Sequence, residues 1–118
     1  MHHSIRPFIG SKNFFESKAF YTDLGFQESP IATGFSYFKI NHTIGFYLQD
    51  AFVEDWINNT QLFIEVEDVE AYYVQVQQLE LTKKYSSARL IPIRYTDWGS
   101  EFFLHDPAGI LWHFGNFK

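Results

Sequence analysis

An internal repeat constrains this chain more than any other sequence feature. Residues 8–26 (FIGSKNFFESKAFYTDLGF) align with residues 63–81 (FIEVEDVEAYYVQVQQLEL). Each copy opens with an apolar, strand-like run and continues to Asn13 or Asp68, residue types that cap helices by accepting backbone N–H bonds. Apolar residues at helical spacing follow in both copies. The repeat therefore predicts two strand–cap–helix units.

Strand-like runs follow each predicted helix, separated by turn residues. The first set covers 26–31, 35–40 and 43–49, and the second covers 90–95, 101–105 and 110–114. In the turn at 106–109 (DPAG), the proline favours the second turn position and the glycine tolerates a positive φ. These runs extend both units to the pattern βαβββ.

The predicted fold class is therefore α+β, with two βαβββ half-units in a single domain, 1–118. The half-units cover 5–49 and 60–117, and residues 50–59 form the linker between them. Each half-unit is a half-barrel sheet with one helix on its outer face. The other faces of the paired sheets are expected to enclose a cleft.

Composition fits such a domain. The chain has 118 residues, of which 46% are hydrophobic and 20% aromatic. Either all of these rings belong to the core, or a surplus lines a cavity or an interface; counting alone leaves both open. The chain has no cysteine, which excludes disulfides and thiolate metal sites and fits a reducing compartment, here expected to be the cytoplasm.

Charge and hydropathy narrow the choice of partners. The formal net charge is −5 and the basic residues are dispersed, so a nucleic-acid partner is not expected. No apolar stretch approaches the roughly 20 residues of a membrane span, and the N-terminus does not resemble a secretory signal. On net charge alone, a cationic ligand is electrostatically easier than an anionic one.

The duplicated layout and several local motifs resemble the vicinal-oxygen-chelate (glyoxalase/bleomycin resistance/dioxygenase) superfamily. Residues 19–26 (AFYTDLGF) are similar to its "FY..LGF" helix end. Residues 97–109 (DWGSEFFLHDPAG), with His113-Phe114 after them, are similar to the signature of the bleomycin-resistance branch. The resemblance runs from about Arg6 to Phe114, essentially the whole chain.

Enzymes of this superfamily hold a divalent metal on one inward-facing residue from each of four strands. The resemblance places those positions at Arg6, Tyr47, Gln61 and His113. Arg is a permanent cation without a lone pair, a Tyr must first lose its proton, and Gln offers only a neutral oxygen. Only the histidine is a good ligand, whereas catalytic zinc sites usually need about three. We therefore expect no metal and no cofactor.

Aromatic residues are the main candidates for binding a ligand. The resemblance implies that Trp98 lies against a planar heterocycle, with Phe35 near a second such position. Phe63 and Tyr47 lie on predicted inward faces, and stacking adds about 0.5–1.5 kcal/mol per ring pair. Glu65 and Asp97 are candidates for the acidic side of the cleft. Trp98 has an alternative role in packing the end of a sheet or a dimer interface.

Arg6 and His113 have open roles. A buried Arg6 needs an anion, so it pairs with a carboxylate such as Glu65 or binds an acidic group of the ligand. His113 is either satisfied by neighbours in the cleft wall, a hydrogen-bonding partner of the ligand, or a general base.

Three functions follow. The first is a metal-free small-molecule binding protein of the bleomycin-resistance type, acting on a ligand with a planar heteroaromatic and cationic part. The resemblance implies a homodimer with clefts between subunits, with or without exchange of N-terminal strands. The second is a metal-dependent glyoxalase-like isomerase or lyase, or a dioxygenase. The third is an accessory module whose cleft is sealed by its own side chains.

Overall fold

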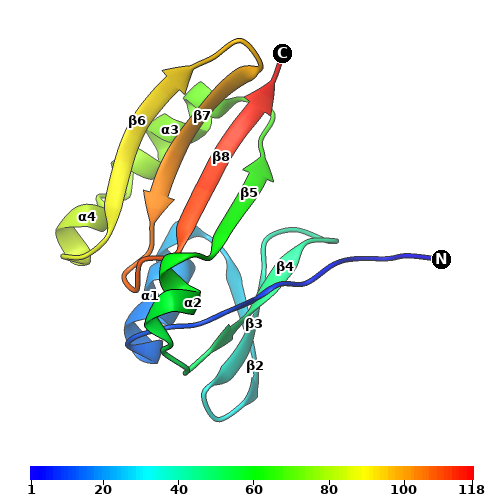
Figure 1. Cartoon of the computed structure of the whole chain (residues 1–118), viewed down its shortest axis with the longest axis vertical. Helices are drawn as coiled ribbons and strands as arrows, with labels where there is room; N and C mark the ends of the chain where they lie inside the picture. The colour runs from blue at the N-terminus through cyan, green and yellow to red at the C-terminus, as the bar shows by residue number, and fades with distance from the viewer.

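The computed structural model describes residues 1–118 and contains two four-stranded sheets (Figure 1). The sheet of half one has the order β1-β4-β3-β2, and the sheet of half two has the order β5-β8-β7-β6. The strands of half one are β1 (Phe8–Ile9), β2 (Gln27–Ala32), β3 (Phe35–Lys39) and β4 (Gly45–Gln49). Those of half two are β5 (Gln61–Glu65), β6 (Arg89–Tyr95), β7 (Gly99–His105) and β8 (Leu111–Phe117). The predicted α+β fold with two βαβββ half-units is confirmed.

Each half has the same strand directions. The β1–β4 and β5–β8 pairs are parallel, whereas the other neighbouring strands are antiparallel. A parallel pair needs a long crossover, and in both halves the crossover includes the predicted helix. The sheets stand beside one another as two open layers and do not close into one barrel (Figure 1).

In each half, one long helix covers one face of the sheet. Helix α1 (Phe14–Leu24) contacts β2 and β4, and α3 (Val69–Gln78) contacts β6, β7 and β8 and lies behind the second sheet in Figure 1. The caps are those expected from the repeat: Asn13 accepts from the Glu16 N–H and Asp68 accepts from the Ala71 N–H. The local signals in the repeated segments therefore set where both helices begin.

Two short helices were not expected from the sequence. Helix α2 (Glu54–Asn58) lies within residues 50–59, and α4 (Leu81–Lys84) follows α3. Neither is long enough to show helical periodicity. Helix α2 is nevertheless more than a connection, because Ile57 is fully buried and Trp56 packs so closely on Gly10 that a Cβ there would lie 2.7 Å from the indole.

The core is one cluster of 20 buried hydrophobic residues. It holds ten of the aromatic side chains, so most rings lie outside it. The two halves are joined within the core by a hydrogen-bonded group: the Tyr21 hydroxyl of α1 donates to Asp106 at 2.5 Å and accepts from the Trp112 indole N–H at 2.9 Å. Of the two alternatives left open by composition, the structure thus favours a surplus of rings outside the core.

None of the helices here is long and apolar enough to span a bilayer.

Candidate ligand-binding site

Each sheet has an open face, which we define as the face turned away from its helix. In half one, alternate residues of β3 point to the two faces: Ser36 and Phe38 are buried under α1, whereas Phe35 and Tyr37 are half-buried on the open face. In half two, Phe102 and Leu104 are buried and Phe103 lies on the open face. The open faces therefore present side chains to a ligand or a partner.

Three stacked rings form the centre of the half-one open face. The ring centroids of Phe8 and Tyr47 are 4.7 Å apart, and those of Phe35 and Tyr47 are 5.3 Å apart. The Phe8 and Phe35 rings are nearly parallel, with an interplanar angle of 12°. Half of the Phe8 side chain is exposed. This ring cluster therefore offers a flat apolar surface.

Arg6 lies beside the half-one rings. Its Nη1 donates to the Tyr47 hydroxyl at 3.0 Å, and its guanidinium carbon lies 4.4 Å from the centre of the Tyr37 ring. That hydrogen bond is the main reason why the pKa of Arg6 is raised above its usual value. Arg6 is exposed and forms no ion pair. The expectation that it is buried, and with it the need for a carboxylate such as Glu65, is wrong for the single chain.

A second group of rings lies on the half-two open face. Phe63, Trp98 and Phe117 have centroid separations between 5.5 and 6.2 Å. All three are substantially exposed, Trp98 at 38% and Phe63 at 42%. The His113 ring continues the group, 6.1 Å from Phe63. Trp98 lies among rings at the end of the sheet, an arrangement that serves either packing or stacking on a ligand.

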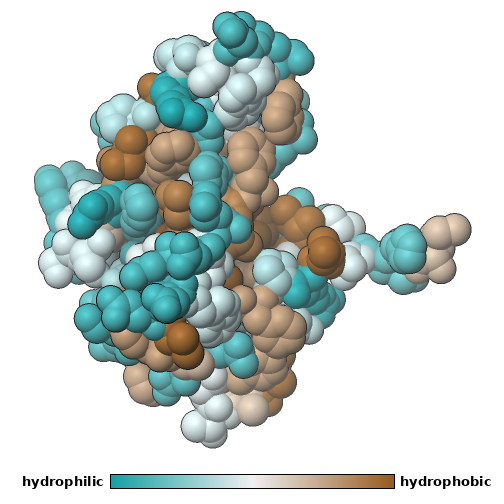
Figure 2. Space-filling view, in the orientation of Figure 1, coloured by the Kyte–Doolittle hydropathy of each residue, from teal (hydrophilic) through white to brown (hydrophobic).

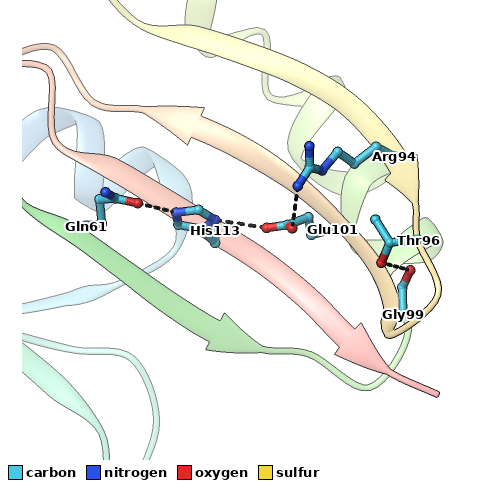
Figure 3. A network of polar contacts seen from close by, with 6 residues as sticks. All are labelled: Gln61, Arg94, Thr96, Gly99, Glu101 and His113. Carbon is cyan, nitrogen blue, oxygen red and sulfur yellow. Dashed lines mark hydrogen bonds and ion pairs between the residues drawn. The ribbon is translucent and has the colours of Figure 1, made fainter.

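A chain of polar contacts crosses the half-two open face (Figure 3). His113 Nδ1 lies 2.9 Å from Glu101 Oε1, and His113 Nε2 lies 2.8 Å from Gln61 Oε1. Glu101 is only 4% exposed and is also 3.5 Å from an Arg94 guanidinium nitrogen. A buried carboxylate is expensive unless it is paired, and His113 and Arg94 pair it here. His113 is thus satisfied by its neighbours, one of its three expected roles.

His105 of β7 lies on the same face, two residues along the strand from Phe103, which pairs with His113. Burial lowers the pKa of His105, and the positive charge of Arg89 lowers it further. Both effects favour the neutral form of its imidazole.

The four residues placed at metal-ligand positions form two equivalent pairs. Phe8 faces Tyr47 in the first sheet as Phe63 faces His113 in the second, so Arg6 corresponds to Gln61 and Tyr47 to His113. In the first pair, the permanently charged guanidinium of Arg6 lies against Tyr47. No group of three or more His, Cys, Asp or Glu side chains is close enough to hold a metal ion. These residues do not fit a divalent metal.

A groove of about 700 Å³ separates the two halves. It is bordered by Ile5, Arg6 and Pro7, the start of β4 and the whole of β5, including Gln61, Phe63 and Glu65. Figure 2 shows hydrophobic surface gathered where the N-terminal segment meets the two halves. Phe35, Tyr47, Trp98 and His113 do not line this groove. Four of the eight candidate residues, Arg6 from half one and Gln61, Phe63 and Glu65 from half two, thus share this groove, and the other four lie on the two sheets outside it.

The sequence analysis missed several residues of these faces. Phe8 aligns with Phe63 in the repeat, and this equivalence was a usable signal. Glu101 belongs to the "WG.EF" motif, in which it is the only acidic residue between the glycine and the phenylalanines. Tyr37 and Arg94 are found only from strand register, because their contacts are made across neighbouring strands.

Comparison with known proteins supports the fold. No protein-family model and no curated protein matches the chain. Among solved structures, the bleomycin-binding protein of Streptomyces verticillus, complexed with copper(II)-bleomycin, has a TM-score of 0.83 at 21% identity, covering 100% of this chain and 98% of that one.

Two further structures extend the comparison. TnmS3, an antibiotic binding protein from a Streptomyces, has a TM-score of 0.76 at 16% identity, with 100% of this chain and 98% of that chain covered. The fosfomycin resistance protein FosX from Mesorhizobium loti has a TM-score of 0.71 at 11% identity, with coverage of 100% and 95%. The chain therefore has the fold of the bleomycin-binding proteins, as the resemblance predicts.

Proposed function

We propose that this protein is a small-molecule binding protein of the bleomycin-resistance type, which holds a planar aromatic ligand without a metal ion. The observation that carries the proposal is the pair of exposed ring clusters on the open faces, Phe8–Phe35–Tyr47 and Phe63–Trp98–Phe117. Planar ligands stack on such rings and also gain from burial of their apolar surface. The bleomycin-binding protein and the antibiotic binding protein TnmS3 have the same fold, which supports this function.

We further propose that two copies of the chain complete the binding chamber, with half one of one copy facing half two of its partner. In a single chain the Phe63–Trp98–Phe117 cluster and the Phe8 ring are exposed, and Phe35 and Tyr47 are half-buried. Contiguous apolar surface of this kind usually marks an interface or a ligand site. A partner sheet would cover each cluster and leave the ligand between two aromatic walls. Sedimentation of the purified protein should therefore give the mass of a dimer.

Exchange of N-terminal strands is a variant of this arrangement. Strand β1 pairs with β4 of its own chain, and the Tyr47 N–H donates to the Pro7 carbonyl. Residues 1–4 are exposed, and the N-terminal end of the chain extends away from the body (Figure 1). We propose that this segment reaches the partner, whether or not β1 itself is exchanged. Deletion of residues 1–4 should then weaken the dimer without unfolding the protein.

Calorimetric titration of the Trp98→Ala variant tests the binding role. The probes are bleomycin and the neutral planar compound naphthamide. Loss of one stacked ring and its burial should weaken binding of the probe at least about tenfold, equivalent to about 1.4 kcal/mol. Phe15→Ala is the matched control, because this ring is 76% exposed on α1, away from both open faces.

Two outcomes would contradict the proposal. Unchanged affinity in Trp98→Ala would assign Trp98 to packing only, and no binding of either probe to the parent protein would reject the binding function itself. Elemental analysis before and after chelator treatment addresses the metal-dependent enzyme: a stoichiometric metal whose removal abolishes an activity would favour that alternative.

A further inference from the structure

We propose that the ligand is an aromatic carboxylate, with its ring on the Phe8–Phe35–Tyr47 cluster and its carboxylate paired with Arg6. This inference rests on the proposed function and names the chemical class of its ligand. It is opposite in sign to the cationic ligand that the net charge of −5 favours. An anionic ligand is favoured because the positive charges are concentrated on the open faces, although the net charge of the chain is negative.

Arg6 is set up as an anion-binding group. A guanidinium has five N–H donors, and only one of them is used, in the bond to the Tyr47 hydroxyl. That bond and the Tyr37 ring 4.4 Å away hold the cation at the edge of the ring cluster. The remaining donors have the fork geometry that binds a carboxylate through two parallel hydrogen bonds.

The rest of the half-one open face provides no competing anion. Strand register places Gln27, Ser29, Lys39 and Gln49 on this face beside the rings, and none of its strand residues is Asp or Glu. Lys39 is a second cation there, two residues from Tyr37, and it too lacks an ion-pair partner. An anion bound at Arg6 therefore meets no acidic neighbour from this sheet.

The charges of the half-two open face also favour an anionic ligand. All three arginines of this acidic chain, Arg6, Arg89 and Arg94, lie on the open faces. Arg94 is paired with Glu101, whereas Arg89 forms no ion pair. Among the strand residues of the half-two open face, only Glu65 and Glu101 have carboxylate side chains. Cations thus outnumber carboxylates on the binding surfaces, although carboxylates outnumber cations in the whole chain.

The test compares three probes with the same ring system: naphthoate, naphthamide and naphthylmethylammonium. Each is titrated by calorimetry into the parent protein, Arg6→Gln, Arg6→Lys and Lys12→Gln. The last variant is the matched control, because Lys12 is an exposed cation outside the open faces, near Phe52. Thermal unfolding verifies that each variant is folded, which we expect because Arg6 and Lys12 are both exposed.

We expect naphthoate to bind at least about tenfold more tightly than naphthamide, and the ammonium probe to bind most weakly. Arg6→Gln should abolish the preference for naphthoate over naphthamide, Arg6→Lys should retain part of it, and Lys12→Gln should retain all of it. The preference should also shrink as salt increases.

Equal binding of naphthoate and naphthamide, or tighter binding of the ammonium probe, would overturn the aromatic-carboxylate inference and leave the proposed function standing. Retention of the naphthoate preference in Arg6→Gln would overturn the role of Arg6. Absence of binding for all three probes would overturn both the inference and the proposed function.

Discussion

The open faces of the two halves have the same backbone arrangement and different chemistry. At equivalent register positions, half one has Tyr47 where half two has His113. Tyr47 contacts an exposed arginine, whereas His113 contacts a buried carboxylate. One face is therefore a ring cluster with an available cation, and the other is a ring cluster with an internally satisfied polar chain. Duplication preserved the scaffold and left the side chains free to diverge.

The turns that follow these faces differ in the same way. In half one, the exposed Asn41 side chain accepts from the Thr43 and Ile44 N–H groups between β3 and β4. In half two, the fully buried Asp106 accepts three backbone N–H bonds at 2.9 Å between β7 and β8, and a fourth bond from Tyr21 of half one. Only the second turn also joins the halves.

The largest effect should come from truncating the turn residues. Asp106→Ala leaves the Tyr21 hydroxyl and three backbone N–H groups without their acceptor in a buried site, and should reduce the free energy of unfolding by about 3–5 kcal/mol. Asn41→Ala, whose donors are exposed to water, should cost less than about 1.5 kcal/mol. Chemical denaturation measures both. Equal losses would show that the turns do not differ in their structural role.

A pH dependence should follow from the same aspartate. Burial raises the pKa of Asp106 from 3.8 to about 6, although its hydrogen bonds with Tyr21 and the backbone oppose the shift. Because the pKa is higher in the folded protein, its contribution to stability is complete below pH 3.8 and is lost as pH rises through about 6. Relative to Asp106→Asn, the parent protein should lose about 3 kcal/mol between about pH 4 and pH 7.

Denaturation curves of the two proteins across that range measure this difference. Asp97→Asn is the control, since Asp97 is exposed, and its difference from the parent should stay constant. A parent protein that gains stability over Asp106→Asn as pH rises would mean that the hydrogen bonds outweigh burial.

Substitution at the equivalent positions on the open faces should give the smaller effects. His113→Phe leaves Glu101 buried with only Arg94 at 3.5 Å, and should reduce the free energy of unfolding by about 1–3 kcal/mol. Tyr47→Phe removes one bond to an exposed arginine and should change it by no more than about 0.5 kcal/mol. A loss in Tyr47→Phe as large as that in His113→Phe would contradict the contrast between the faces.

Much of the fold was predictable because its signals are local. The caps at Asn13 and Asp68 and the turn at 106–109 all depend on residues within four positions of one another. Helices α2 and α4 escaped prediction because a helix of one turn has no periodicity to read.

The candidate site was less predictable, because its contacts join distant parts of the chain. The resemblance brought out Arg6, Tyr47, Gln61 and His113, but it did not indicate that they pair within each half. The sequence predicts Glu65 and Asp97 as the acidic residues of the cleft from their positions alone. The buried carboxylate is Glu101, whose partners lie on β6 and β8.

The sequence by itself determined a duplicated βαβββ scaffold with many aromatic side chains, and the family resemblance added four positions whose residue types do not suit a divalent metal. These properties depend on residue type and on spacing along the chain. Only the tertiary structure decided which ring stacks on which, which cation lacks a partner and which carboxylate is buried. Those outcomes depend on strand register and on packing between segments far apart in sequence, where a shift of one residue moves a side chain to the opposite face.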